Sequence, residues 1–226
     1  MSNLHLIRQP VIVAFVLIAV GCTSTSGTRV PLQKSTIDSI QMITVDVQKE
    51  EDFTVIKARE QKSHAGAMMF GLLGAAVEHA AAASSDRGFR NDVLPMLGDY
   101  PVDVIFEDKL KEILINSNRF AKVESFVNGK VSSSTSATLS IALKEWGLRP
   151  CVGGGTTEQL QVGLHIEGKL RKQDSEDPVW ERDELYLSHE CHRLKDYRTQ
   201  ENLLRNSLSR SVTDLAGKTA NEILYP

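Results

Sequence analysis

The densest group of potentially reactive side chains in this sequence is the run Ser188-His189-Glu190-Cys191-His192. Thiolate sulfur and imidazole nitrogen are ligands that zinc prefers, so this run could form a zinc site together with Cys151. The HExxH spacing fails, however, because Arg193 stands where the second histidine would be. Paired C-x-x-C ligands are also absent from the sequence. We therefore predict no metal site, although a metal-binding protein or a hydrolase stays open as an alternative.

Two further stretches resemble ligand sites only in composition. Residues 151–157, CVGGGTT, are rich in glycine, but they lack the lysine of a phosphate-binding loop and precede a strand pattern. Glu181, Asp183 and Glu184 are close in sequence, but no calcium-loop spacing supports them, and they are typical of a solvated strand face. No serine nucleophile elbow or dinucleotide fingerprint occurs. The sequence thus predicts no catalytic residues and a protein that is not an enzyme.

The strongest signal is a leader. Val11–Val20 is an uninterrupted apolar run of the length found in the core of a secretory signal, and it is shorter than the roughly 20 residues that span a bilayer. It ends in Ala19-Val20-Gly21-Cys22, which resembles the lipobox of bacterial lipoprotein precursors. An ordinary secretory signal with a coincidental cysteine, or an uncleaved anchor, would explain the same run.

The lipobox resemblance implies that residues 1–21 are a signal peptide and that Cys22 becomes the first residue of the mature chain. It also implies that Cys22 carries a diacylglycerol on sulfur and an N-acyl group such as palmitate, with no other cofactor. Two or more acyl chains hold a protein durably on a membrane, whereas one does so only marginally. Thr23 follows the cysteine in place of Asp, and the resemblance then implies release to the outer membrane, where we expect the protein on the periplasmic face.

Charge and cysteine content fit an exported body. The formal net charge is −3, so nothing in the composition favours nucleic acid as a partner. The chain has three cysteines, and an even pair remains once Cys22 is lipidated. In an exported chain, Cys151 and Cys191 are therefore predicted to form a disulfide, which also argues against a catalytic thiol. This disulfide would close a loop of about 40 residues and would stabilise the folded chain by about 4 kcal/mol in the chain-entropy model.

Periodicity predicts a single α+β domain. Residues 22–36 begin with small and polar side chains and are expected to be the lipidated cysteine and a flexible tether, followed by one periplasmic domain over 37–226. Period-two alternation predicts strands, and apolar residues at helical spacing predict helices. The expected strands are 40–47, 120–127, 138–146, 160–171 and 179–187, and the expected helices are 101–116 and about 198–224. We expect a mostly antiparallel sheet of about four or five strands, with the long C-terminal helix and one or two further helices packed on it.

The segment His64–Ser85 is almost entirely apolar or small. As a helix, it would carry small residues at four-residue spacing, a pattern that permits close helix approach, including in membranes. Three interpretations stay open: a buried helix of the soluble body, a contact with the membrane or with other copies of the chain, and a loop. The candidates for the second are Gly66, Ala67, Phe70, Gly71, Gly74 and Ala75.

These features predict a lipid-anchored outer-membrane lipoprotein without catalytic activity that binds or supports an assembly of envelope proteins. The expected partners are the membrane, through the anchor, and either another envelope protein or a second copy. The alternative is a ring-forming or membrane-contacting lipoprotein of secretion or transport that uses residues 64–85.

Overall fold

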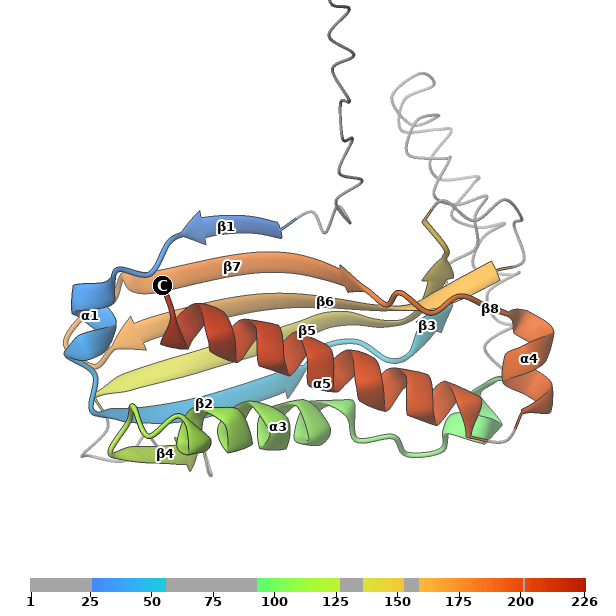
Figure 1. The fold of residues 1–226 in the computed structure, drawn as a ribbon, viewed down its shortest axis with the longest axis horizontal. Helices are drawn as coiled ribbons and strands as arrows, with labels where there is room; N and C mark the ends of the chain where they lie inside the picture. Colours follow the sequence, from blue (N-terminus) through green and yellow to red (C-terminus); the bar gives the residue numbers. More distant parts are fainter. Residues whose placement is uncertain (1–25, 56–92, 127–135, 153–158, 201) are drawn as a thin grey trace, which may run out of the picture.

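One mixed sheet with helices on one face forms the body of the protein (Figure 1). The computed structural model describes residues 26–55, 93–126, 136–152, 159–200 and 202–226. Cys22 and the segment 64–85, with its candidate residues, lie outside these ranges. Among the described residues, no helix is both long enough and apolar enough to cross a membrane.

Most of the expected helices and strands lie close to their predicted positions, and several short elements occur in addition. A helical turn covers residues 93–97. The helices are α1 (Lys34–Asp38), α3 (Val102–Asn116), α4 (Leu194–Thr199) and α5 (Leu203–Leu224). The strands are β1 (Ser26–Val30), β2 (Met42–Lys49), β3 (Thr54–Val55), β4 (Lys122–Ser125), β5 (Ala137–Pro150), β6 (Gln159–Lys172), β7 (Pro178–Leu187) and β8 (His192–Arg193).

The sheet is larger than expected and is not purely antiparallel. Its eight strands include the path β1-β7-β6-β5-β2-β4, with β3 paired to β5 and β8 paired to β6. The pairs from β1 to β5 along this path are antiparallel, whereas β2 runs parallel to both β4 and β5. The parallel pairing of β2 with β4 fits the connection between them, because α3 lies between them in the chain and parallel strands need such a crossover.

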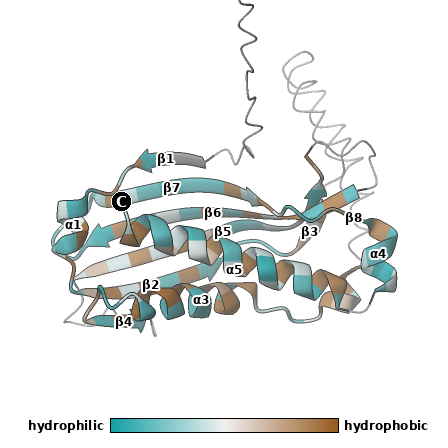
Figure 2. Cartoon of the chain, viewed as in Figure 1, coloured by the Kyte–Doolittle hydropathy of each residue, from teal (hydrophilic) through white to brown (hydrophobic). Residues whose placement is uncertain are grey.

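The core lies between the sheet and the helices α3 and α5. Leu139, Ile141 and Leu143 of β5 are buried, and so are alternate residues of β6. The buried faces of the helices contribute Phe106, Leu110, Leu114, Leu208, Val212, Leu215 and Ile223. Polar and apolar positions alternate along both helices in Figure 2, as expected for helices with one buried side.

The predicted C-terminal helix is divided into two. A single helix was expected from about residue 198, but α4 ends at Thr199 and α5 begins at Leu203. Asn202 has φ 65°, a left-handed conformation that asparagine adopts more readily than most residues. The break turns the chain, so that α5 can cross the sheet while α4 lies at its end (Figure 1).

The segment expected to be a flexible tether contains a strand. Ser26–Val30 forms β1 and pairs antiparallel with β7, and α1 begins at Lys34. Composition suggested a tether because small polar residues bury little apolar surface. A strand at a sheet edge instead satisfies backbone N–H and C=O groups that β7 would otherwise expose, and this needs no apolar side chains.

Candidate functional site

The face of the sheet that α3 and α5 leave uncovered carries a continuous set of ion pairs. On β6, Leu164, Ile166, Gly168 and Leu170 are buried, while His165, Glu167 and Lys169 are partly exposed on the opposite face. We call the charged residues of this second face on β1, β6 and β7 the open-face network. Its members are Arg29, His165, Glu167, Lys169, Glu181 and Asp183.

Arg29 connects the edge strand β1 to this network. Its Nη2 donates to Asp183 Oδ2 at 3.0 Å, and its Nη1 lies 3.4 Å from Glu181 Oε1 and 3.8 Å from Glu167 Oε1. The Arg29 side chain is 53 % exposed, so each pair is individually weak. Together they complement three carboxylates that two neighbouring strands bring to one point.

Hydrogen bonds within the network shift several pKa values. The His165 imidazole, with Nε2 at 2.6 Å from Asp183 Oδ1, is the main cause of the lowered pKa of Asp183. The Lys169 ammonium, 2.7 Å from Glu167 Oε1, lowers the pKa of Glu167, and the pKa of Lys169 is raised in return. Each of these three shifts favours the charged form, so Lys169 and Glu167 stabilise each other as ions and the Asp183 carboxyl is favoured as a carboxylate.

A second ionic cluster lies on the covered face, and sequence analysis missed it. Arg182 and Glu184 are fully buried, with Nη2 of Arg182 2.5 Å from Oε2 of Glu184. Arg182 also pairs with Glu222 of α5, and Lys218 of α5 pairs with Glu184. The expectation that Glu184 shares a solvated face with Glu181 and Asp183 is therefore wrong. Strand alternation from the buried Trp180 could have revealed it, because it places residues 182 and 184 on the core side.

The residues of the run Ser188–His192 make structural contacts at one end of the sheet. Cys191 forms the predicted disulfide with Cys151, across a sequence separation of 40. Ser188 Oγ accepts from the Val162 backbone N–H at 3.0 Å and donates to the Glu190 carbonyl. The His192 ring meets the Tyr197 ring edge-on at a centroid distance of 5.5 Å. In the part of the chain that the structure describes, no group of three His, Cys, Asp or Glu residues could hold a metal ion.

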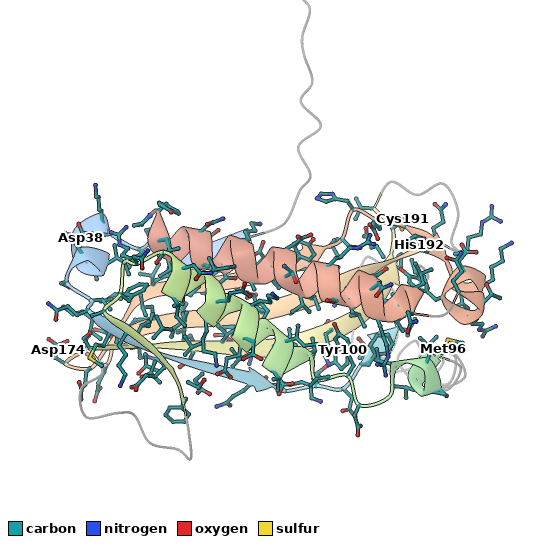
Figure 3. The ribbon with its side chains drawn as sticks, turned by 60° about the horizontal axis from the view of Figure 1, so that its bottom comes forward. Asp38, Met96, Tyr100, Asp174, Cys191 and His192 are labelled. Atoms are coloured by element: carbon teal, nitrogen blue, oxygen red, sulfur yellow. A yellow bond between two sulfur atoms is a disulfide. The ribbon has the colours of Figure 1, made fainter. Side chains whose placement is uncertain are left out.

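A pocket of about 450 Å³ lies beside the start of α5. Its lining residues are Met96, Tyr197, Arg198, Thr199, Gln200, Asn202, Leu204 and Arg205. Arg205 donates to the backbone carbonyl of Met96 at 3.2 Å and to that of Leu97 at 2.7 Å, so its charge fastens the 93–97 turn to α5. Figure 3 shows Met96 at the same end of the molecule as Cys191 and His192, and Asp38 and Asp174 at the other end.

No protein-family model and no curated protein sequence matches the chain. Similar solved structures include the PelC dodecamer from Paraburkholderia phytofirmans, at 12% identity over 89% of this chain and 97% of that chain, with a TM-score of 0.45. Protein XCC0632 from Xanthomonas campestris, of family DUF330, is 11% identical over 88% of this chain and 93% of that one, with a TM-score of 0.45. A candidate lipoprotein from Caulobacter crescentus is 9% identical over 56% and 83%, with a TM-score of 0.32. Because these scores lie below 0.5, the likenesses carry no argument about function.

Proposed function

We propose that this protein is a lipid-anchored lipoprotein on the periplasmic face of the bacterial outer membrane. Acyl chains on Cys22 hold it there, and its α+β body binds or supports an assembly of envelope proteins without catalysing a reaction. The proposal joins the lipobox-like Ala19-Val20-Gly21-Cys22 with a folded body whose first described strand begins at Ser26.

The observation that carries the proposal is the Cys151–Cys191 disulfide. Disulfides persist in oxidising compartments such as the periplasm and are rare in the cytosol. The disulfide thus supports export independently of the leader sequence. Of the three cysteines, it also leaves Cys22 as the one available for acylation.

A binding role, as opposed to a catalytic one, is supported by the state of the charged side chains. His165, Asp183 and Glu167 on the open face are each engaged with a neighbouring charge. Their contacts favour the ionised carboxylates and hold them in place. A general base would instead need a pKa near the working pH.

The test is acylation and fractionation of the full-length protein in bacteria. We expect wild-type protein to incorporate labelled palmitate and to fractionate with the outer membrane, and Cys22→Ser to do neither. Cys151→Ser is the matched control, because it removes a cysteine but leaves the lipobox intact, so labelling should persist. Equal labelling and equal fractionation of the wild type and Cys22→Ser would contradict the proposal.

The alternative proposal, self-association or membrane contact through residues 64–85, rests on the small-residue pattern of that segment. Its test is the native mass of the detergent-extracted protein by light scattering. Replacing Gly71 and Gly74 with leucine should reduce a multimeric mass to that of the monomer. An unchanged mass in this variant would count against the alternative.

A further inference from the structure

The distance between the acylated residue and the folded body is short. Only residues 23–25 separate Cys22 from Ser26, where β1 begins. An extended chain spans at most about 3.6 Å per residue, so the Cα atom of Cys22 lies within about 14 Å of that of Ser26. The tether expected over residues 22–36 would have allowed several times this reach.

We propose that the sheet edge formed by β1 and β7 faces the phospholipid bilayer and that the β4 edge points into the periplasm. This inference rests on the proposed acylation of Cys22. A bilayer surface is the occupant that the geometry points to, because β1 begins only four residues after Cys22, the residue proposed to carry the acyl chains. Figure 1 shows β1 and β4 at opposite margins of the sheet.

The pairing of β1 keeps the tether short. Its residues pair with β7 from Ser26, opposite Glu184, to Val30, opposite Glu181. Arg29 adds contacts to Asp183, Glu181 and Glu167 on the open face. Releasing more chain would therefore break both the backbone ladder and these ion pairs.

The strand order gives the expected distance of the opposite sheet edge from the membrane. The path β1-β7-β6-β5-β2-β4 contains five strand-to-strand steps. Neighbouring strands lie about 4.8 Å apart, so β4 is about 24 Å from β1 across the sheet. With the β1 edge against the headgroups, β4 stands about 24 Å farther from the bilayer.

Energy transfer to a labelled membrane can measure this difference. Since Cys22 carries lipid and the other two cysteines are joined, an introduced cysteine supplies a free thiol for a donor dye. Pro31→Cys, just after β1, and His189→Cys, just after β7, report the proximal edge. Lys122→Cys on β4 reports the distal edge, and all three positions are exposed.

The acylated variants are reconstituted into vesicles of phosphatidylethanolamine and phosphatidylglycerol that contain a headgroup acceptor dye. We expect more transfer from both proximal positions than from Lys122→Cys. A transfer from Lys122→Cys that equals or exceeds that of either proximal position would overturn the proposal. Mass spectrometry before reconstitution shows whether the protein is acylated. Absence of acyl groups would contradict the proposed function. Equal transfer from acylated protein would contradict only the proposed orientation.

A long Gly/Ser insertion between Thr25 and Ser26 is the matched control. It leaves β1 and the rest of the body unchanged but lengthens the connection to Cys22. The difference between proximal and distal positions should then disappear. Its persistence would show that the short tether does not set the orientation, and would overturn that part of the proposal.

Discussion

At the scale of single residues, the most demanding feature is the buried Arg182–Glu184 pair. Both side chains have no exposed surface, and they lie beneath α5, whose Glu222 and Lys218 complete the cluster. A buried charge is tolerated only while it is paired, because desolvation otherwise costs several kcal/mol. This cluster therefore couples β7 to α5 more specifically than apolar packing alone.

We predict that Glu184→Gln lowers the free energy of unfolding by about 3–5 kcal/mol, because Arg182 stays buried without its fully buried partner. Glu222→Gln is the control. It also removes a partner of Arg182, but its side chain is 34 % exposed, so its loss should be clearly smaller. Urea unfolding of the two variants measures both values. Equal losses would show that burial of Glu184 does not matter.

Acid sensitivity should depend on the His165–Asp183 contact. His165 is the main cause of the lowered pKa of Asp183, with Arg29 as a further contributor. A carboxyl group with a depressed folded-state pKa adds stability above its unfolded pKa of about 3.9, and this stability is lost as the pH falls through the folded value. His165→Gln should raise the pKa of Asp183 toward its ordinary value, so that this contribution decreases. NMR titration of the Asp183 carboxyl carbon measures the shift, and an unchanged pKa would refute the assigned cause.

At the scale of elements, strand positions could be predicted from sequence far better than strand pairing. Alternation located β5, β6 and β7 because each has one buried and one wet face. The parallel pairing of β2 with β4 and β5 could not be read from alternation, since alternation indicates which side chains share a face but not the direction or neighbours of a strand. Strand β1 was not predicted because it is stabilised by backbone pairing with β7, which the composition of Ser26–Val30 does not reveal.

The candidate site was predictable to a similar degree. The disulfide followed from counting cysteines and is present, whereas the ion pairs of the open face depend on which strands are neighbours. Arg29 is about 150 residues from its partners in sequence, so no local pattern could connect them. The break at Asn202 was not predicted, although residues 198–202, RTQEN, contain no apolar side chain that would extend the buried stripe of α5.

Close approach of β3 to β5 gives an element-scale prediction. Gly147 has φ 153°, and a Cβ atom there would lie 1.8 Å from the carbonyl oxygen of Thr54. We expect Gly147→Ala to displace β3 and to lower the free energy of unfolding by about 1–3 kcal/mol. Gly217→Ala in α5 is the matched control, because its Cβ would lie 3.9 Å from Ile113 Cδ1, an ordinary contact.

In the control, the added methyl should be neutral or should stabilise by up to about 1 kcal/mol, because alanine favours a helix interior over glycine. Denaturant unfolding compares the two variants with the wild type. If both changed stability in the same direction and by the same amount, the proposed clash at Gly147 would be incorrect.

At the scale of the whole molecule, distant segments are tied together at the end of the sheet that holds α1. The Arg119 guanidinium contacts Asp38 at the end of α1 and the carbonyl of Leu224 at the end of α5. The opposite end is held by the disulfide and by Arg205, which fastens the 93–97 turn. Contacts between distant segments thus stabilise both ends of the body. Within the described residues, the edge strands β1 and β4 have no further strand paired on their outer sides.

Removing β1 distinguishes a strand that belongs to this body from a segment that only leads to it. A chain of residues 32–226 should unfold more easily than one of residues 26–226, by on the order of 1–3 kcal/mol, because β7 loses a hydrogen-bonded neighbour. The longer chain with Arg29→Gln keeps the ladder and loses only the ion pairs of the exposed Arg29 side chain, so it should lose at most about 1 kcal/mol. Urea unfolding ranks the three. Equal stability of the two lengths would make residues 26–30 a tether after all, and the sheet edge would then have no fixed distance from Cys22.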